Sequence, residues 1–178
     1  RAARVGGWRE LDVETGAGGT KLLRVPGSAL DLGGIAKGYG VDRAASVLRE
    51  HGVFRGLVNV GGDLMALGDG PGGRPWRIGV RDPARPESTV TTLEVVDRGV
   101  ATSGDYLRYF EHDGRRYHHV LNGKTGGPTR AGPRSVTLTA RSVMSADAAA
   151  TWAFAHGPDG LGERLRDRND DVRLEHTI

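Results

Sequence analysis

The stretch Asp31-Leu-Gly-Gly-Ile-Ala-Lys-Gly-Tyr-Gly-Val-Asp42 decides how the rest of this chain is interpreted. A short apolar segment, residues 22–30, precedes it, and apolar residues at helical spacing follow from Val41 to Leu48. This order predicts a strand, a glycine-rich turn and the start of a helix. The glycines let the backbone approach a ligand closely, and the free N–H groups of a helix N-terminus favour an anion such as phosphate. Lys37 adds a positive charge at the same place.

The same residues also have an ordinary interpretation. They fit neither the G-x-G-x-x-G template of dinucleotide sites nor the G-x-x-x-x-G-K-[ST] template of the P-loop. A glycine-rich connection that holds no ligand explains the local pattern equally well. The choice between the two interpretations therefore depends on motifs elsewhere in the chain.

Composition narrows the class of protein. The chain has 178 residues, enough for one domain with its own core, and its 29 glycines and 8 prolines predict many turns. Its 25 Lys and Arg residues nearly balance 22 Asp and Glu residues, without a basic run, so we expect no nucleic-acid partner. The absence of cysteine excludes disulfides, zinc-thiolate sites and a cysteine nucleophile. No apolar run is long enough to span a membrane, so we expect no transmembrane segment in this chain.

Periodicity predicts one α+β domain with mainly antiparallel strands and two or three helices. Alternating segments predict strands at 57–60 (extended by 65–67), 76–80, 89–96 and 135–140, and an edge strand at 172–175. They also predict a hairpin formed by residues 11–14 and 21–25, a small-residue turn that ends the segment 99–104, and a hairpin turn at 112–115. Helical spacing predicts helices at 41–51, ended by Gly52, at 146–156, capped by Ser145, and at 161–168.

Asp147 and Thr151 form the second informative pattern. They lie four residues apart, so they share one face of the predicted helix, and the three alanines between them leave room against that face. A carboxylate and a hydroxyl are hard oxygen ligands that suit Mg²⁺ bound to phosphate oxygens. The alternative is structural, with Asp147 as a first-turn dipole partner and Thr151 bonded back within its own helix.

Three further places have both a functional and a structural interpretation. The tandem pair His118-His119 lies in an alternating segment, so one imidazole faces inward, and an inward histidine near phosphate can act as an acid or base. Thr102-Ser-Gly104 offers hydroxyls and an open backbone to a ligand. Gly61-Gly62-Asp63 is a tight turn followed by an acid. Structural roles are commoner for all three patterns.

Taken together, six motifs resemble the ApbE family of FAD:protein FMN transferases. They are Asp31–Asp42, Asn59-Val-Gly-Gly-Asp63, Trp76-Arg-Ile-Gly-Val-Arg-Asp-Pro83, Ala101-Thr-Ser-Gly104, Tyr117-His-His-Val-Leu121 with Thr125-Gly126, and Ser145-Ala-Asp-Ala-Ala-Ala-Thr151. They occur in the family's order and span about residues 5–165. The resemblance implies an ApbE-like, T-fold-like α+β domain over residues 1–178.

The resemblance also implies a reaction. Family members transfer FMN from FAD to a Thr or Ser hydroxyl of a client protein and release AMP, with Mg²⁺ at the pyrophosphate. Matched by position, Asp147, Thr151 and the backbone carbonyl of Gly34 are the expected Mg²⁺ ligands. The positions expected to contact FAD are Asp31, Lys37, Ser103, Gly104, His119 and the backbone of Val120 and Leu121. His119 is the candidate base or electrostatic helper. Alternatives are an FAD pyrophosphatase, which releases FMN and AMP, and a non-catalytic flavin-binding or scaffold protein.

Two departures from the family pattern affect this expectation. Asn122-Gly123-Lys124 stands where the family usually has Asp-Pro and a basic residue, although Asn-Gly is itself a good turn pair. Family members also carry about a hundred further residues upstream, so the chain looks like the C-terminal portion of the usual family chain. Many relatives are exported or lipid-anchored, but this stretch does not decide the compartment.

Overall fold

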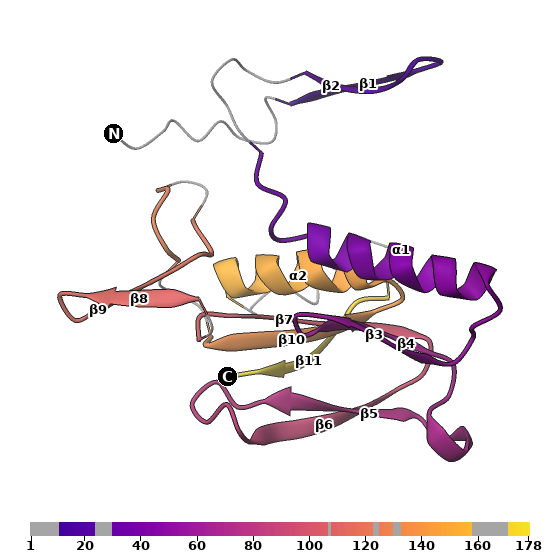
Figure 1. Cartoon of the computed structure of the whole chain (residues 1–178). Helices are drawn as coiled ribbons and strands as arrows, with labels where there is room; N and C mark the ends of the chain where they lie inside the picture. The colour runs from indigo at the N-terminus through magenta and orange to yellow at the C-terminus, as the bar shows by residue number, and fades with distance from the viewer. Residues whose placement is uncertain (1–10, 24–29, 107, 123–124, 130–132, 158–170) are drawn as a thin grey trace.

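A five-stranded antiparallel sheet, in the order β11-β10-β7-β4-β3, lies at the centre of the computed structural model (Figure 1). Its strands are β3 Gly56–Val60, β4 Asp63–Leu67, β7 Arg98–Gly104, β10 Ser135–Ala140 and β11 Arg173–Thr177. The structure describes residues 11–23, 30–106, 108–122, 125–129, 133–157 and 171–178. Every neighbouring pair in this sheet is antiparallel, so the predicted α+β class with mainly antiparallel strands is confirmed.

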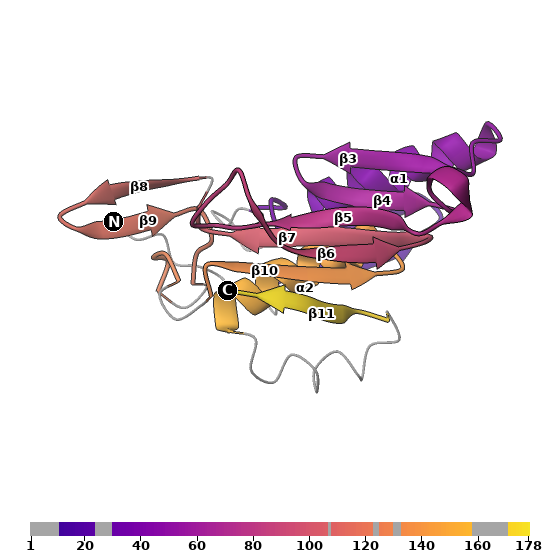
Figure 2. The same ribbon diagram turned by 90° about the horizontal axis from the view of Figure 1, so that it is seen from below.

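Two helices cover one face of the sheet and a hairpin covers the other. Helices α1 (Ala36–Glu50) and α2 (Val143–His156) lie side by side on one face, and strands β5 (Trp76–Arg81) and β6 (Thr89–Val95) form the hairpin, preceded by the 3₁₀ turn Pro71–Gly73 (Figure 2). Strand β4 is buried throughout because both of its faces are covered. Met65 and Leu67 pack with α1, whereas Leu64 and Ala66 pack with the β5–β6 hairpin.

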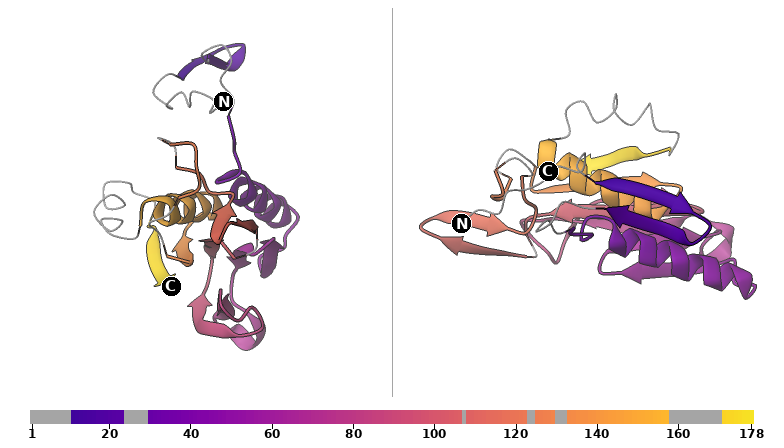
Figure 3. Two further views of the ribbon diagram at one scale, coloured as in Figure 1. Left: turned by 90° about the vertical axis from the view of Figure 1, so that its left-hand side faces the viewer. Right: turned by 90° about the horizontal axis from the view of Figure 1, so that it is seen from above.

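Two small hairpins project from this core. Strands β1 (Asp12–Gly16) and β2 (Gly19–Leu23) form one, and β8 (Tyr109–His112) and β9 (Arg115–His118) form the other (Figure 3). Phe110 stacks on Tyr117 across the second hairpin, with ring centroids 5.0 Å apart. The predicted hairpins at both places are confirmed, as are the strands at 76–80, 89–96 and 135–140.

Helix α1 begins at Ala36, five residues before the predicted start at Val41. The amides of Ile35 and Ala36 both donate to the carbonyl of Leu32, which starts the helix inside the glycine-rich stretch. Gly38 and Gly40 are therefore helical residues and not part of a turn, which corrects the prediction. Gly52, with φ of +78°, ends the helix as predicted.

Three other local predictions were wrong. Residues 57–67 do not form one extended strand, because Gly61 and Gly62 have φ of +59° and +101° and turn the chain into the β3–β4 hairpin. Residues 98–104 form strand β7 and not a small-residue turn. The helix expected to start after Ser145 starts at Val143, because Ser142 is the N-cap and accepts from the Ser145 amide. The helix predicted at 161–168 lies outside the described residues.

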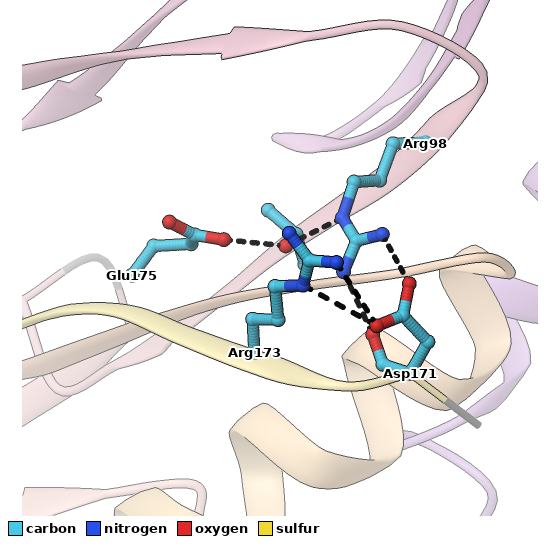
Figure 4. A network of polar contacts seen from close by, with 5 residues as sticks. Arg98, Asp171, Arg173 and Glu175 are labelled. Atoms are coloured by element: carbon cyan, nitrogen blue, oxygen red, sulfur yellow. Dashed lines mark hydrogen bonds and ion pairs between the residues drawn. The ribbon is translucent and has the colours of Figure 1, made fainter. Parts of the chain in front are cut away.

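The edge strand β11 is held by a polar network (Figure 4). Arg98 donates from Nη1 to Asp171 Oδ2 at 2.6 Å and from Nε to Thr139 Oγ1 at 2.9 Å. Thr139 in turn donates to Glu175 at 2.6 Å. Because Arg98 belongs to β7, Thr139 to β10 and Glu175 to β11, the network ties three adjacent strands together.

Candidate functional site

Polar residues converge where the first turns of α1 meet α2 and the sheet. The amide of Gly38 donates to Oδ2 of Asp147 at 3.0 Å, although the two residues are 109 positions apart in the chain. A Cβ at Gly38 would lie 2.5 Å from the carbonyl oxygen of Val143, so only glycine permits this approach of the two helices. Asp147 is 3% exposed and therefore points inward from α2.

Gly34 and Ser103 both meet Thr151, which lies one helical turn from Asp147 on α2. A Cβ at Gly34 would lie 2.9 Å from Cγ2 and 3.2 Å from Oγ1 of Thr151. Oγ of Ser103, on β7, lies 3.2 Å from Oγ1 of Thr151. Three residues from different parts of the chain, each singled out from the sequence, are thus brought into contact.

Lys37 and Asp63 form an ion pair at the same place. Nζ of Lys37 lies 2.5 Å from Oδ2 of Asp63, and the amide of Thr102 donates to Oδ1 of Asp63 at 3.3 Å. Asp63 is 1% exposed, whereas the side chain of Lys37 is 42% exposed. From the sequence alone, Asp63 is predicted to be an acid in a tight turn. The signal for a buried role was its position directly after the Gly61-Gly62 turn, at the first residue of a strand covered on both faces.

Burial raises the pKa of Asp147, partly offset by the hydrogen bond from the Gly38 amide. The negative charge of Asp63 raises this pKa further, and the positive charge of Lys37 lowers it. Burial of Asp147 therefore disfavours its charged form, and a bound cation would compensate that charge.

The donor set suits Mg²⁺. Asp147 supplies a carboxylate, Thr151 a hydroxyl and the chain at Gly34 a carbonyl, all hard oxygen donors. The described residues contain no group of three or more His, Asp and Glu side chains that could hold a metal ion. A cation here would therefore depend on hydroxyl, backbone and ligand oxygens besides the single carboxylate, which is common for Mg²⁺ bound with phosphates.

The remaining predicted flavin contacts have clear local roles. Oδ1 of Asp31 accepts from the Gly33 amide at 2.7 Å and shapes the turn before α1. A Cβ at Gly104 would lie 2.7 Å from the ring of Tyr106, so glycine is required there by packing. Val120 is buried in the cluster that contains Ala150 and Phe154, and its carbonyl accepts from Thr129, whereas Leu121 is exposed.

The two histidines point to different environments. His118 is half-buried: its Nε2 lies 2.9 Å from the carbonyl oxygen of Thr129, and its ring meets Phe154 edge-on. His119 is exposed, with Nδ1 3.5 Å from the carbonyl oxygen of Arg108. The inward imidazole is thus His118. His118 and Val120 both pack against α2, and the ring of His119 between them is exposed to solvent.

Asn122 acts as the turn residue at the main departure from the family motif. Its carbonyl accepts from the Gly126 amide at 2.8 Å, and its Oδ1 lies 3.2 Å from the Thr125 amide. The side-chain oxygen thus accepts a turn hydrogen bond that a carboxylate at this position would also accept.

Known proteins similar to this chain belong to one family. The model of the ApbE family matches residues 1–174. The chain belongs to the ApbE family. Relatives of this ApbE-family chain include the FAD:protein FMN transferase of Klebsiella pneumoniae (strain 342), 38% identical over 150 residues, and that of Treponema pallidum (strain Nichols), 38% identical over 164 residues. These matches cover 84% and 87% of this chain but 46% and 45% of the relatives, so the chain spans about half of their length.

Solved ApbE structures share the fold. The crystal structure of the ApbE protein from Thermotoga maritima superposes with a TM-score of 0.83 at 34% identity, covering 97% of this chain and 56% of that one. The flavin transferase ApbE from Vibrio cholerae gives 0.79 at 33% identity, covering 96% and 53%. The ApbE-like fold predicted from the motifs is therefore confirmed. Among the described residues, no helix is long and apolar enough to cross a membrane.

Proposed function

We propose that this ApbE-family chain takes part in the transfer of FMN from FAD to a Thr or Ser hydroxyl of a client protein, with release of AMP and with Mg²⁺ as cofactor. The names of the relatives support flavin transfer, since they are FAD:protein FMN transferases. The observation that carries the proposal is the close approach of Gly34 to Thr151, one helical turn from Asp147, whose charge is influenced by Lys37.

The reaction needs charge neutralisation more than a nucleophile from this chain. The client hydroxyl attacks the phosphorus on the FMN side, a new P–O bond forms, and the bond to the AMP phosphate breaks, with the electron pair leaving on AMP. Bound Mg²⁺ would offset the negative charge of the diphosphate. Asp147, Thr151 and the Gly34 carbonyl would hold it. Lys37 would supply a further positive charge for the diphosphate, and His119 would accept the hydroxyl proton or stabilise charge.

A gel assay tests the function. The purified protein is incubated with FAD, MgCl₂ and an acceptor protein, and flavin fluorescence is read in a denaturing gel while FMN and AMP are measured in solution. Fluorescent acceptor with equimolar AMP supports transfer. FMN and AMP without labelled acceptor indicate an FAD pyrophosphatase, and no product indicates a non-catalytic flavin-binding or scaffold protein.

Asp147→Asn tests the metal ligand. We expect it to abolish Mg²⁺-dependent product formation, and also the rise in thermal unfolding temperature that MgCl₂ with FAD gives the wild type, because a ligand stabilises only a protein that binds it. Asp82→Asn is the matched control, since Asp82 is a carboxylate 7% exposed that pairs with Arg85 in the turn after β5. Unchanged turnover in Asp147→Asn would contradict the metal assignment.

A further inference from the structure

Asp63 is a buried charge for which stability alone is a poor explanation. It follows the Gly61-Gly62 turn, where the Gly62 amide donates to Oδ1 of Asn59 at 3.0 Å, and this turn points residue 63 into the space beneath α1. Burying a carboxylate is costly, and well-packed apolar residues often replace a buried ion pair without loss of stability. The carboxylate therefore calls for a role beyond packing.

The contacts of Asp63 join the elements that carry the candidate site. Its Oδ2 meets Lys37 of α1, its Oδ1 accepts from the amide of Thr102 on β7, and its own backbone begins β4. Residue 102 is followed directly by Ser103, which contacts Thr151. Asp63 also acts electrostatically on Asp147. Asp63 thus contacts α1 and β7 from the start of β4, and its charge acts on Asp147 of α2.

The pair is asymmetric in its exposure. The Asp63 carboxylate is buried, whereas the Lys37 side chain is 42% exposed, so a buried acid holds a side chain that solvent reaches. An ammonium has three N–H donors and turns freely on a flexible stem, so an ion pair with one carboxylate orients it and leaves it able to bind an anion.

We propose that Asp63 is a positioning residue that holds the Lys37 ammonium at the start of α1, ready for the diphosphate of the flavin nucleotide. This role rests on the proposed function, because it presumes that a dinucleotide binds at this site. Asp63 acts through Lys37 and does not itself touch the nucleotide.

Whether Asp63→Asn weakens or tightens FAD binding distinguishes a positioning role from a purely electrostatic one. If Asp63 acted only through its charge, removing it would tighten FAD binding, because a carboxylate repels the diphosphate. If Asp63 positions Lys37, then Asp63→Asn weakens binding instead, because the freed lysine side chain must be ordered by the ligand. The expected loss is about tenfold in the dissociation constant, the scale of one hydrogen bond between charged groups.

Equilibrium binding tests the proposal. Dissociation constants of FAD, ADP and riboflavin are measured with and without MgCl₂ for the wild type, Asp63→Asn and Asp82→Asn. We expect Asp63→Asn to weaken FAD and ADP binding about tenfold and riboflavin binding less than about twofold, because riboflavin lacks the diphosphate. The control Asp82→Asn should leave all three constants unchanged. Equal or tighter FAD binding by Asp63→Asn overturns the positioning role while leaving the proposed function intact.

A double variant gives a second measurement that does not depend on the single variant folding. In Lys37→Met the partner of Asp63 is gone, so adding Asp63→Asn to it should leave FAD binding equal or tighter, because only the repulsion between Asp63 and the diphosphate remains to be removed. A further large loss in the double variant would show that Asp63 acts independently of Lys37 and would overturn the proposal. If the wild type binds neither FAD nor ADP, the proposed function itself fails, and the positioning role with it.

Discussion

Gly38→Ala is the sharpest test of how the site is built, because one methyl group enters the contact between α1 and α2. The new Cβ would lie 2.5 Å from the carbonyl oxygen of Val143 and 2.6 and 2.7 Å from Cα and N of Met144. All three atoms belong to the backbone of α2, so no side-chain rotation relieves the contact. To reach ordinary contact at 3.4 Å, the nearest atom must move by about 0.9 Å.

Two opposing effects set the magnitude. Alanine is favoured over glycine in a helix by about 1 kcal/mol. Against this, overpacking a core costs about 1–3 kcal/mol, and weakening the hydrogen bond from the Gly38 amide to the Asp147 carboxylate costs roughly 1.5–3 kcal/mol. The net prediction is a loss of about 2–4 kcal/mol in the free energy of unfolding.

Gly40→Ala is the matched control, since Gly40 lies in the same helix and a Cβ there has no heavy atom within 4 Å. This variant should gain about 0.5–1 kcal/mol. Equilibrium unfolding in urea, followed by tryptophan fluorescence and far-UV circular dichroism, gives both values. If Gly38→Ala is as stable as Gly40→Ala, the close approach of the two helices is refuted.

Two further variants test the N-terminus of α2 and the C-terminal strand. Asp42→Ala removes the carboxylate that accepts from the Val143 amide at 2.8 Å and from the Met144 amide at 2.9 Å. It should lower the free energy of unfolding by about 1–2 kcal/mol in the same urea titration. The control Arg43→Ala, at the exposed neighbouring residue, should lower it by less than about 0.5 kcal/mol. The hydrogen bond from Arg98 lowers the pKa of Asp171 below 3.8, so this contribution to stability is present above the unfolded pKa and is lost as pH falls through the lower folded value. Acid unfolding should therefore show that Asp171→Asn is less stable near neutral pH but loses less stability on acidification, and identical pH profiles would contradict the Arg98 pair.

Sequence patterns predicted correctly those elements that depend only on residues close together in the chain. The hairpin turn at Asp113-Gly114, the strand Trp76–Arg81 and the Gly52 helix end all follow from backbone preferences and side-chain alternation within a few residues. The same holds for Asp147 and Thr151, because helical spacing alone places them on one face.

Long-range contacts explain the predictions that failed. Glycines at 38 and 40 favour a turn when only their neighbours are considered, so the first residues of α1 were missed. Packing of Gly38 against the backbone of α2 makes the helix favourable there. Ser142 caps α2 by accepting from the Ser145 amide, and Asp42, a hundred residues earlier, accepts from the Val143 and Met144 amides, so the helix begins before Ser145.

The sequence by itself determined the family, the α+β class and the residue types available for chemistry, because motif order and periodicity are written along the chain. Only the tertiary structure decided which of those residues meet. Gly34 touches Thr151, and Gly38 bonds Asp147, because two helices distant in sequence pack on one sheet face. Asp63 becomes a partner of Lys37 for the same reason: burial and charge pairing depend on distances between elements, and the spacing of residues along a chain does not contain those distances.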